Sequence, residues 1–369
     1  MTQLNSLRLA GWKSIRDATI DFRPLNVLIG ANGAGKSNLV SIFKLMSEMI
    51  EGRFQIYVGI TGGAESLLHY GSKQTQVIDV RFRFTTEGGE YAYGIRWVPI
   101  AGNSLLFASE TLGPKVSDIA EAFHPKLGQG HRESLLKDRT INSEFPTAKF
   151  IRGLLTRCRV FHFHDTSLLG PMRRDCRLDT NRFLAPDAAN LPAMLYLYRQ
   201  RYPTAYRRIV AAVKAIAPFF EDFVLEPLRL NPSNIALHWR ARESDYEFGA
   251  YQLSDGTLRA IALFTLLLQP EEDLPELIVL DEPELGLHPA ALAVLADLLK
   301  STSQHSQLIV ATQSAALIDH FEVEDIVTVN LRDGCSTFER LDPEKLKHWL
   351  EEYTLSELWE RNVIGGGPY

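Results

Sequence analysis

Residues 30–37 read Gly-Ala-Asn-Gly-Ala-Gly-Lys-Ser, which matches the pattern G-x-x-x-x-G-K-[ST] at every defined position. The mostly apolar stretch from Leu25 to Ile29 predicts a short buried strand, and apolar residues recur at helical spacing from Leu39 to Met49. A glycine-rich turn that carries Lys-Ser by chance would explain the loop but not these flanking elements. Strand, loop and helix together predict a P-loop, which binds phosphate groups, in an α/β fold.

The residue types in this loop suit a nucleoside triphosphate. The glycines let backbone N–H groups close around the phosphates. Lys36 brings a cation to the β and γ oxygens, and Ser37 offers a hydroxyl ligand for Mg²⁺. We therefore expect ATP and Mg²⁺ as the ligands. The expected nucleotide contacts in the loop are Asn32, Gly33, Ala34, Gly35, Lys36, Ser37 and Asn38.

The composition is that of a globular protein. The chain has 369 residues, of which 45% are hydrophobic, and a formal net charge of −6. This length favours two lobes or a domain with a large insertion. No apolar stretch approaches about 18 residues, and residues 1–5 lack a basic and apolar leader. We expect a soluble, cytoplasmic protein with no membrane partner. Cys158, Cys176 and Cys335 lack paired spacing, which predicts reduced structural thiols.

Charge is distributed unevenly along the chain. Residues 150–210 contain eleven Arg and four Asp, whereas residues 270–369 contain twenty acidic and six basic residues. Such asymmetry predicts that the Arg-rich segment contacts a polyanion or an acidic protein surface. Arginines on solvated helix faces, or paired with the acidic region, would produce the same pattern.

Three arginines, Arg173, Arg174 and Arg177, follow Gly-Pro in an expected loop. A loop presents guanidinium groups outward, and Arg suits bidentate contact with phosphates or carboxylates. We predict that the three contact nucleic acid or an acidic partner. The alternative is that they pair with Asp175, Asp179 or the acidic C-terminal region and hold the segment in place.

Hydrophobic periodicity predicts further elements. Alternation from Ile78 to Phe84 and from Tyr91 to Trp97, around Glu87-Gly88-Gly89, predicts a β-hairpin. Other expected strands are 7–9, 18–22, 160–164, 235–239, 277–280 and 308–311. Expected helices are two within 191–220, one each at 258–268 and 290–299, and one or two short amphipathic helices within 343–361.

A second motif lies far from the P-loop. The apolar residues 277–280 are followed by Asp281 and Glu282, which is the Walker B pattern. A buried strand would deliver Asp281 to hold Mg²⁺, and Glu282 would stand beside the γ-phosphate and orient the attacking water. An ordinary core strand that ends in acidic residues is the alternative, but it does not explain the P-loop upstream.

Residues 253–257, Leu-Ser-Asp-Gly-Thr, resemble the L-S-G-G-Q signature of ABC-type ATPases. The resemblance implies that Ser254 and Gly256 open a helix whose N-terminus caps the γ-phosphate bound to a second subunit. Asp255 replaces the first signature glycine, so the match is partial. Ser-Asp as a plain helix N-cap is the alternative.

Three further stretches resemble the RecF-like and OLD-like branch of that superfamily, which is related to SMC proteins. Residues 282–289, Glu-Pro-Glu-Leu-Gly-Leu-His-Pro, resemble its D-loop, which lies at the interface between heads. Residues 312–314, Thr-Gln-Ser, occupy the place of the switch motif T-H-S, with Gln313 for the histidine. Gln313 can hydrogen-bond a γ-phosphate but cannot become cationic. Residues 12–15, Trp-Lys-Ser-Ile, resemble a segment by the nucleotide base, which implicates Lys13, while Trp12 suits the core.

The resemblance covers roughly residues 1–100 and 230–330 and implies an ABC-type P-loop ATPase head with an antiparallel β lobe and a mainly helical insertion. Too few residues separate Lys36 from Ser254 for the long coiled-coil arms of SMC proteins. Gln55, Gln74 and Gln76 are candidates for the Q-loop residue, and each also suits the surface. The expected segments are an N-terminal ATPase lobe at 1–100, an Arg-rich insertion at 101–230, a C-terminal ATPase lobe at 231–330 and a helical tail at 331–369.

These features predict an ATPase that hydrolyses ATP to ADP and phosphate, with Lys36, Glu282 and Gln313 as catalytic residues. As the resemblance implies, it would form a head-to-head homodimer or a higher oligomer. It would regulate a separate nucleic-acid-directed effector, such as a Toprim-like nuclease, in antiphage defence. The residues after Gln313 are too few for the fused Toprim nuclease of many relatives.

The main alternative is a RecF-like repair or recombination protein that binds DNA itself. A transporter ATPase subunit is disfavoured by the D-loop and the Arg-rich insertion. A small-molecule kinase would leave Ser254 and the D-loop without a purpose.

Overall fold

The computed structural model describes residues 3–86, 89–114, 126–138 and 146–367. Its centre is a six-stranded sheet in the order β18-β17-β3-β16-β15-β8, parallel except for β18. The strands are β3 (Leu25–Ile29), β8 (Cys158–Phe161), β15 (Leu277–Asp281), β16 (Gln307–Thr312), β17 (Ile326–Arg332) and β18 (Cys335–Arg340). The strands expected at 25–29, 277–280 and 308–311 are therefore confirmed. β8 overlaps the first two residues of the strand expected at 160–164 and begins two residues before it.

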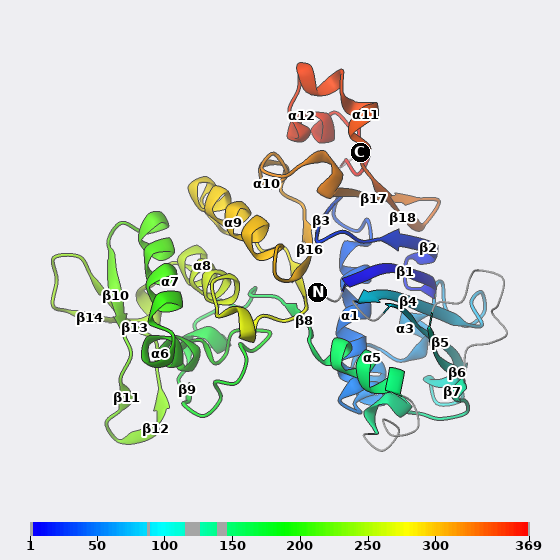
Figure 1. Cartoon of the computed structure of the whole chain (residues 1–369), viewed down its shortest axis with the longest axis horizontal. Helices are drawn as coiled ribbons and strands as arrows, with labels where there is room; N and C mark the ends of the chain where they lie inside the picture. The colour runs from blue at the N-terminus through cyan, green and yellow to red at the C-terminus, as the bar shows by residue number, and fades with distance from the viewer. Residues whose placement is uncertain (1–2, 87–88, 115–125, 139–145, 368–369) are drawn as a thin grey trace.

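The central sheet is covered on both faces, which is why its strands are continuous apolar runs instead of alternating ones. Ile278 and Leu280 face a core shared with α6 to α9, whereas Leu277 and Val279 face a second core around α1. Successive side chains of one strand thus enter two different cores. Figure 1 shows the two sides, with the β1–β4–β5 sheet and α1 on the right and α6 to α8 on the left.

An antiparallel sheet in the order β2-β1-β4-β5-β6-β7 encloses α1 from the other side. The elements on this side are β1 (Gln3–Trp12), β2 (Ile15–Asp21), β4 (Ile78–Thr86), β5 (Gly89–Ile100), β6 (Ser104–Pro114), β7 (Lys126–Gly128), α1 (Lys36–Ile50), α2 (Phe54–Ile60), α3 (Ala64–Leu67) and α5 (Pro146–Thr156). The expected hairpin is confirmed, with Ile78 opposite Trp97. Glu87 and Gly88 of its turn lie outside the described residues.

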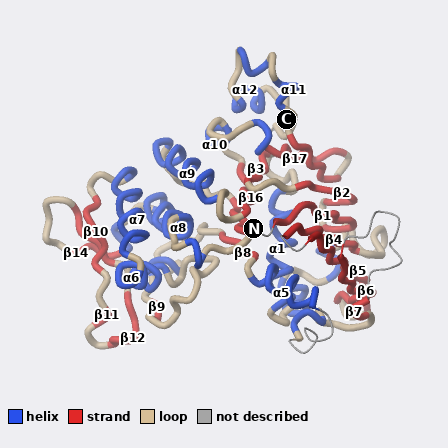
Figure 2. Tube along the Cα trace, in the orientation of Figure 1, coloured by secondary structure: helices blue, strands red, loops and turns tan. Residues whose placement is uncertain are grey.

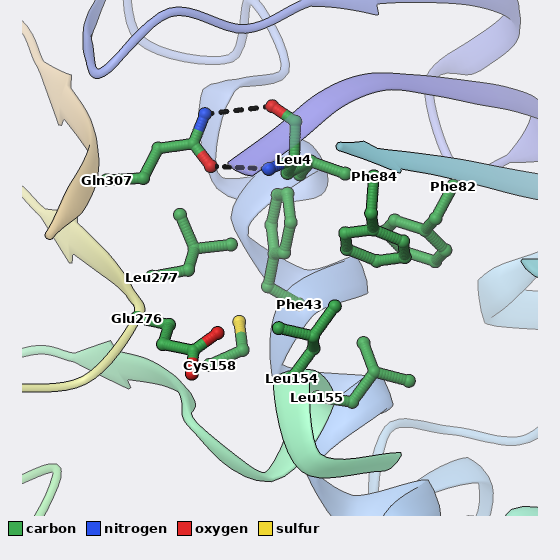
Figure 3. Close-up of a pocket in the computed structure, with 10 residues that line it drawn as sticks. All are labelled: Leu4, Phe43, Phe82, Phe84, Leu154, Leu155, Cys158, Glu276, Leu277 and Gln307. Atoms are coloured by element: carbon green, nitrogen blue, oxygen red, sulfur yellow. Dashed lines mark hydrogen bonds between the residues drawn. The ribbon is translucent and has the colours of Figure 1, made fainter. Parts of the chain in front are cut away.

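The Gln307 side chain hydrogen-bonds across from the central sheet to the antiparallel sheet. Gln307, at the start of β16, donates from Nε2 to the Leu4 carbonyl and accepts at Oε1 from the Leu4 N–H, each at 2.8 Å. Figure 3 shows this pair above a small apolar pocket lined by Phe43, Phe82 and Leu277, among others. The Gln307 amide pairs with the buried backbone groups of Leu4, which would be costly to leave unpaired.

The other lobe is mainly helical, as Figure 2 shows by its blue segments. Its elements are α6 (Leu191–Arg201), α7 (Pro203–Ile216), α8 (Asp255–Leu267), α9 (Pro289–Thr302), β9 (Cys176–Arg177), β10 (Phe220–Val224), β11 (Pro227–Leu228), β12 (Asn231–Ile235), β13 (His238–Ala241) and β14 (Glu247–Gly249). The two helices expected within 191–220 are confirmed, and Pro203 begins the second, where a missing N–H costs nothing. The helices expected at 258–268 and 290–299 are confirmed as α8 and α9.

The single strand expected at 235–239 is wrong. Ile235 ends β12, which pairs with β9 and β11, whereas Trp239 belongs to β13, which pairs with β10 and β14. Both side chains are buried in the same core. Apolar alternation therefore continues across a change of sheet, and a period of two cannot reveal that change.

The C-terminal region contains the short helices α10 (Ala315–Ile318), α11 (Pro343–Leu346) and α12 (Leu355–Glu360). The expected amphipathic helices within 343–361 are confirmed, with Leu358 and Trp359 buried in the core. The Ser356 hydroxyl and N–H both bond Asp319, which follows α10. The tail is therefore docked beside the segment that follows Gln313.

The sheets are assembled across the expected segments. β6 continues the antiparallel sheet beyond residue 100, and β8, from within 101–230, pairs with β15 of the central sheet. Strands from different expected segments thus pair within one sheet. The division into four segments stays a proposal about chain organisation.

Candidate nucleotide-binding site

The P-loop joins β3 to α1 and depends on glycine at its closing position. Gly35 caps α1 with φ +113°, a left-handed conformation that favours glycine. A Cβ there would lie 2.0 Å from Ser336 Oγ of β18. The Ser336 hydroxyl itself donates to the Ala34 carbonyl at 2.7 Å. Both backbone conformation and close packing therefore exclude a side chain at residue 35.

Lys36 is buried and is the cation of the loop. Its Nζ donates to the carbonyls of Gly30 at 2.6 Å and Ala31 at 3.1 Å. Burial lowers the pKa of Lys36, and the carboxylates of Glu282 and Asp281 oppose that shift. The ammonium is thus held at the centre of the loop by its own backbone, within the field of the Walker B carboxylates.

Asp281 ends β15, directly beside β16 and one strand removed from the P-loop strand. Burial, and next the neighbouring Glu282, raise the pKa of Asp281, while a hydrogen bond from the Ser37 side chain opposes them. Asp281 Oδ1 is buried and has no hydrogen-bond partner among the described residues. A buried carboxylate oxygen without a partner, close to an exposed hydroxyl, suits a hard cation such as Mg²⁺.

Glu282 adopts a left-handed backbone with φ +45°, which is uncommon outside glycine. Its N–H donates to the Ala311 carbonyl of β16 at 2.7 Å. The ladder between β15 and β16 therefore extends to the Glu282 N–H, the left-handed backbone follows directly, and the Glu282 side chain is half-buried. Strained residues of this kind occur at functional sites more often than elsewhere.

Glu284, which was not among the predicted site residues, links the D-loop to the switch segment. Its Oε1 accepts from the Thr312 hydroxyl at 2.5 Å and from the Gln313 N–H at 3.1 Å. Burial raises the pKa of Glu284. The second Glu of the stretch 282–289, two residues after Glu282, was the sequence signal that could have identified it. Gln313 thus sits at the end of β16 with its backbone fixed by a neighbouring loop.

The signature residues lie on the other lobe. Ser254 is exposed, caps α8, and accepts at Oγ from the Thr257 N–H at 3.2 Å. A Cβ on Gly256 would lie 2.1 Å from the Gly286 carbonyl oxygen of the D-loop. Arg259 of α8 donates to the Leu285 carbonyl at 2.8 Å. The signature helix and the D-loop therefore form one packed unit.

We predict that Gly256→Ala destabilises this unit by about 1–3 kcal/mol, because the new methyl overlaps backbone, which has little room to move. Gly249→Ala is the matched control, since its Cβ would meet nothing closer than 3.8 Å. Urea unfolding of both variants measures the difference. Equal midpoints for the two would contradict the close packing of α8 on the D-loop.

The segment implicated in base binding packs against α1. Trp12 is fully buried, as expected for a core residue, and donates from Nε1 to the Asn38 carbonyl at 2.9 Å. Lys13 Nζ donates to Ser41 Oγ at 2.9 Å, and Asn38 Nδ2 donates to Ser14 Oγ at 2.7 Å. Lys13 and Asn38 are thus near the first turns of α1 and are engaged with protein groups.

None of the Q-loop candidates lies among the Walker residues. Gln55 on α2 bonds the carbonyls of Leu105 and Arg132, and Gln74 and Gln76 are exposed in the stretch between α3 and β4. His164, three residues after β8, instead donates from Nε2 to the Asp281 carbonyl at 3.0 Å. It lies there because β8 is the parallel neighbour of β15, which no sequence motif indicated.

The outward orientation predicted for Arg173 is wrong. The Arg173 side chain is 5% exposed and pairs with Asp255. Arg177 is exposed and pairs with Asp179 at 2.6 Å, which agrees with the alternative stated for it. Arg174 alone of the three is exposed with no ion pair among the described residues. Burial of Arg173 follows from its packing under the loop that precedes α8, which the local sequence does not encode.

Comparison with known proteins identifies the family. Residues 25–319 match the model described as "AAA domain, putative AbiEii toxin, Type IV TA system". The chain belongs to this family. The match spans the P-loop, the signature, Walker B and Gln313. No protein of curated function matches the chain in sequence.

Solved Smc head domains share the fold. One, bound to the C-winged helix domain of ScpA, superposes with a TM-score of 0.62 at 19% identity, over 94% of this chain and 99% of that one. Another, from Pyrococcus furiosus with an extended coiled coil and the C-terminal domain of ScpA, gives 0.62 at 17% identity, over 95% and 99%. A third, from Pyrococcus yayanosii with a coiled coil and joint, gives 0.55 at 14% identity, over 95% and 99%.

These findings confirm the expected fold class: the chain belongs to an AAA family and has the α/β fold of ABC-type heads such as those of Smc proteins. In the described part of the chain, no helix has the length and apolar character needed to cross a bilayer.

Proposed function

We propose that this protein binds ATP with Mg²⁺ and hydrolyses it between two copies of the head, and that its nucleotide state controls a separately encoded effector that acts on nucleic acid. The observation that carries the proposal is the position of two sequence-distant motifs at the carboxyl ends of β3 and β15, two parallel strands separated only by β16. This places Lys36 and Ser37 near Asp281 and Glu282. The family description, which names a toxin, supports a role in defence.

The residues divide the chemistry among themselves. The P-loop amides and Lys36 would bind the β and γ phosphates and balance their charge. Ser37 and Asp281 would hold Mg²⁺, which when bound adds further positive charge at the phosphates. Glu282 would accept a proton from the attacking water and orient it, and Gln313 would hydrogen-bond the γ-phosphate.

The proposal includes a second copy because Ser254 caps α8 and Gly256 lies on it, and α8 packs in the other lobe with α7 and α9 rather than beside α1. The first turn of a helix has backbone amides without intrahelical partners, and the helix dipole at the exposed N-terminus of α8 favours an anion. In a head-to-head arrangement it would cap the γ-phosphate held by the partner copy.

We predict that Ser254→Arg retains ATP binding by a single subunit but lowers steady-state hydrolysis by about 100-fold. The reason is that the larger side chain would obstruct the partner copy's γ-phosphate and so disturb its alignment for reaction. Phosphate release measures turnover, and fluorescent-nucleotide titration measures binding. An equimolar mixture of Ser254→Arg and Lys36→Ala should regain about a quarter of the wild-type rate, because mixed dimers contain one intact site. An inactive mixture, with each subunit still able to dimerise, would overturn the role in trans.

Direct DNA binding is the second candidate function, favoured by the exposed Arg174, Arg207 and Arg208. It predicts DNA affinity that falls steeply with salt concentration. Binding of duplex DNA by the pure protein, lost on replacing these three arginines by Ala, would support it. The effector proposal instead expects no DNA binding by the pure protein in the absence of its effector.

A further inference from the structure

Asp255 stands where the ABC signature has glycine, at the first residue of α8, and its side chain is 61% exposed. A carboxylate there lowers the energy of the helix N-terminus. The same carboxylate would repel a phosphate that approaches the same amides. An anion site at this helix therefore requires that the charge of Asp255 be balanced.

Arg173 supplies that balance. Its Nη2 donates to Asp255 Oδ1 at 2.7 Å. The same guanidinium donates to the carbonyls of Thr166, at 2.8 Å, of Leu253, at 3.3 Å, and of Ala250. Asp255 is its only ion-pair partner among the described residues. The ion pair and the hydrogen bonds to the carbonyls together offset the cost of burying this charge.

The contacts also fix the backbone of the signature. The Leu253 carbonyl, which accepts from Arg173, belongs to the residue before Ser254, and Ala250 begins the turn that leads into it. At the start of the 165–173 loop, the Asp165 side chain accepts a hydrogen bond from the Ser167 N–H at 3.2 Å. One guanidinium therefore joins the 165–173 loop to the start of α8.

We propose that Arg173 is a positioning residue of the composite phosphate site. It neutralises Asp255 and holds the Leu253–Asp255 backbone, so that the N-terminus of α8 accepts the γ-phosphate of the partner copy's ATP. Arg173 acts through Asp255 and the backbone and does not touch the nucleotide. The inference rests on the dimer proposed above. It adds to that proposal the ion pair between Arg173 and Asp255, the residue that replaces the first signature glycine.

The test separates charge balance from mere packing by a double-mutant cycle. Arg173→Gln retains an amide donor for the carbonyls but removes the charge. We expect it to raise the protein concentration for half-maximal ATPase activity by about tenfold, with single-subunit nucleotide binding unchanged. Adding Asp255→Asn should return that concentration to within about threefold of wild type. A penalty for Arg173→Gln that is equally large when Asp255→Asn is already present would overturn the proposal.

Substitution of Asp255, the exposed member of the ion pair, provides a second test if Arg173→Gln does not fold. Asp255→Asn alone leaves Arg173 cationic beside the site, and we expect the half-maximal protein concentration to fall by about threefold. A rise would overturn the inference. Arg177→Gln and Asp179→Asn are matched controls, because that pair is exposed in the same segment, and both should leave the value unchanged.

Failure of the dimer proposal is recognised separately. It would appear in the wild-type protein as ATPase activity per subunit that does not depend on protein concentration, with no ATP-dependent increase in mass by light scattering. That result would overturn both the dimer and the role of Arg173. A concentration-dependent wild type with an unaffected Arg173→Gln variant would overturn only the latter.

Discussion

Glu282→Gln is expected to slow ATP hydrolysis by about 10²–10⁴-fold while ATP binding is retained, since the amide keeps the size of the side chain but cannot accept the proton of water. The left-handed backbone of Glu282 places this side chain off the end of β15, beside Asp281. Single-turnover phosphate release measures the chemical step, and equilibrium titration measures binding.

The trapped variant should also accumulate as an ATP-dependent dimer, detected as a doubled mass in light scattering. Glu276→Gln is the control, because Glu276 is half-buried just before the opposite end of the same strand and should keep wild-type turnover. Turnover by Glu282→Gln at the wild-type rate would remove Glu282 from the chemistry.

Lys36→Ala is expected to weaken ATP binding by at least about 30-fold, because removing a buried, hydrogen-bonded charge leaves its partner charges uncompensated. In this chain the ammonium also faces Glu282 and Asp281, which would then repel the phosphates. Hydrolysis should be lost as well. Fluorescent-nucleotide titration at fixed Mg²⁺ measures the affinity.

The matched control is Lys44→Ala, which removes an exposed lysine from the same helix. It should bind ATP as wild type does. A melting temperature of Lys36→Ala close to that of wild type would show that the loop still folds. Unchanged affinity in a folded Lys36→Ala variant would refute the placement of the phosphates at residues 30–37.

The part of the fold around the candidate nucleotide-binding site was predictable because its signals are local. Gly35, Lys36 and Ser37 lie next to one another in the chain, and the buried strand before Asp281 is a continuous apolar run. Backbone geometry and hydrophobic burial act over a few residues in these stretches, so the pattern and the structure agree. The hairpin of β4 and β5 was predictable for the same reason.

Long-range pairings were not predictable. Arg173 and Asp255 are separated by 82 positions, and Glu284 and Thr312 by 28. The sequence around Arg173 suggested an exposed basic loop, and only the packing of the 165–173 loop against the loop that precedes α8 buries it. Likewise, alternation at Ile235 and Trp239 could not reveal that the chain changes sheets between them.

The sequence by itself determined the P-loop, the Walker B strand, the signature helix and their order, and hence the ABC-type head. Only the tertiary structure decided which carboxylate balances which cation, where His164 lies and how Glu284 joins the D-loop to Gln313. The physical reason is that a motif records the backbone geometry of neighbouring residues, whereas charge pairing depends on distances set by strand order and by the packing of two cores.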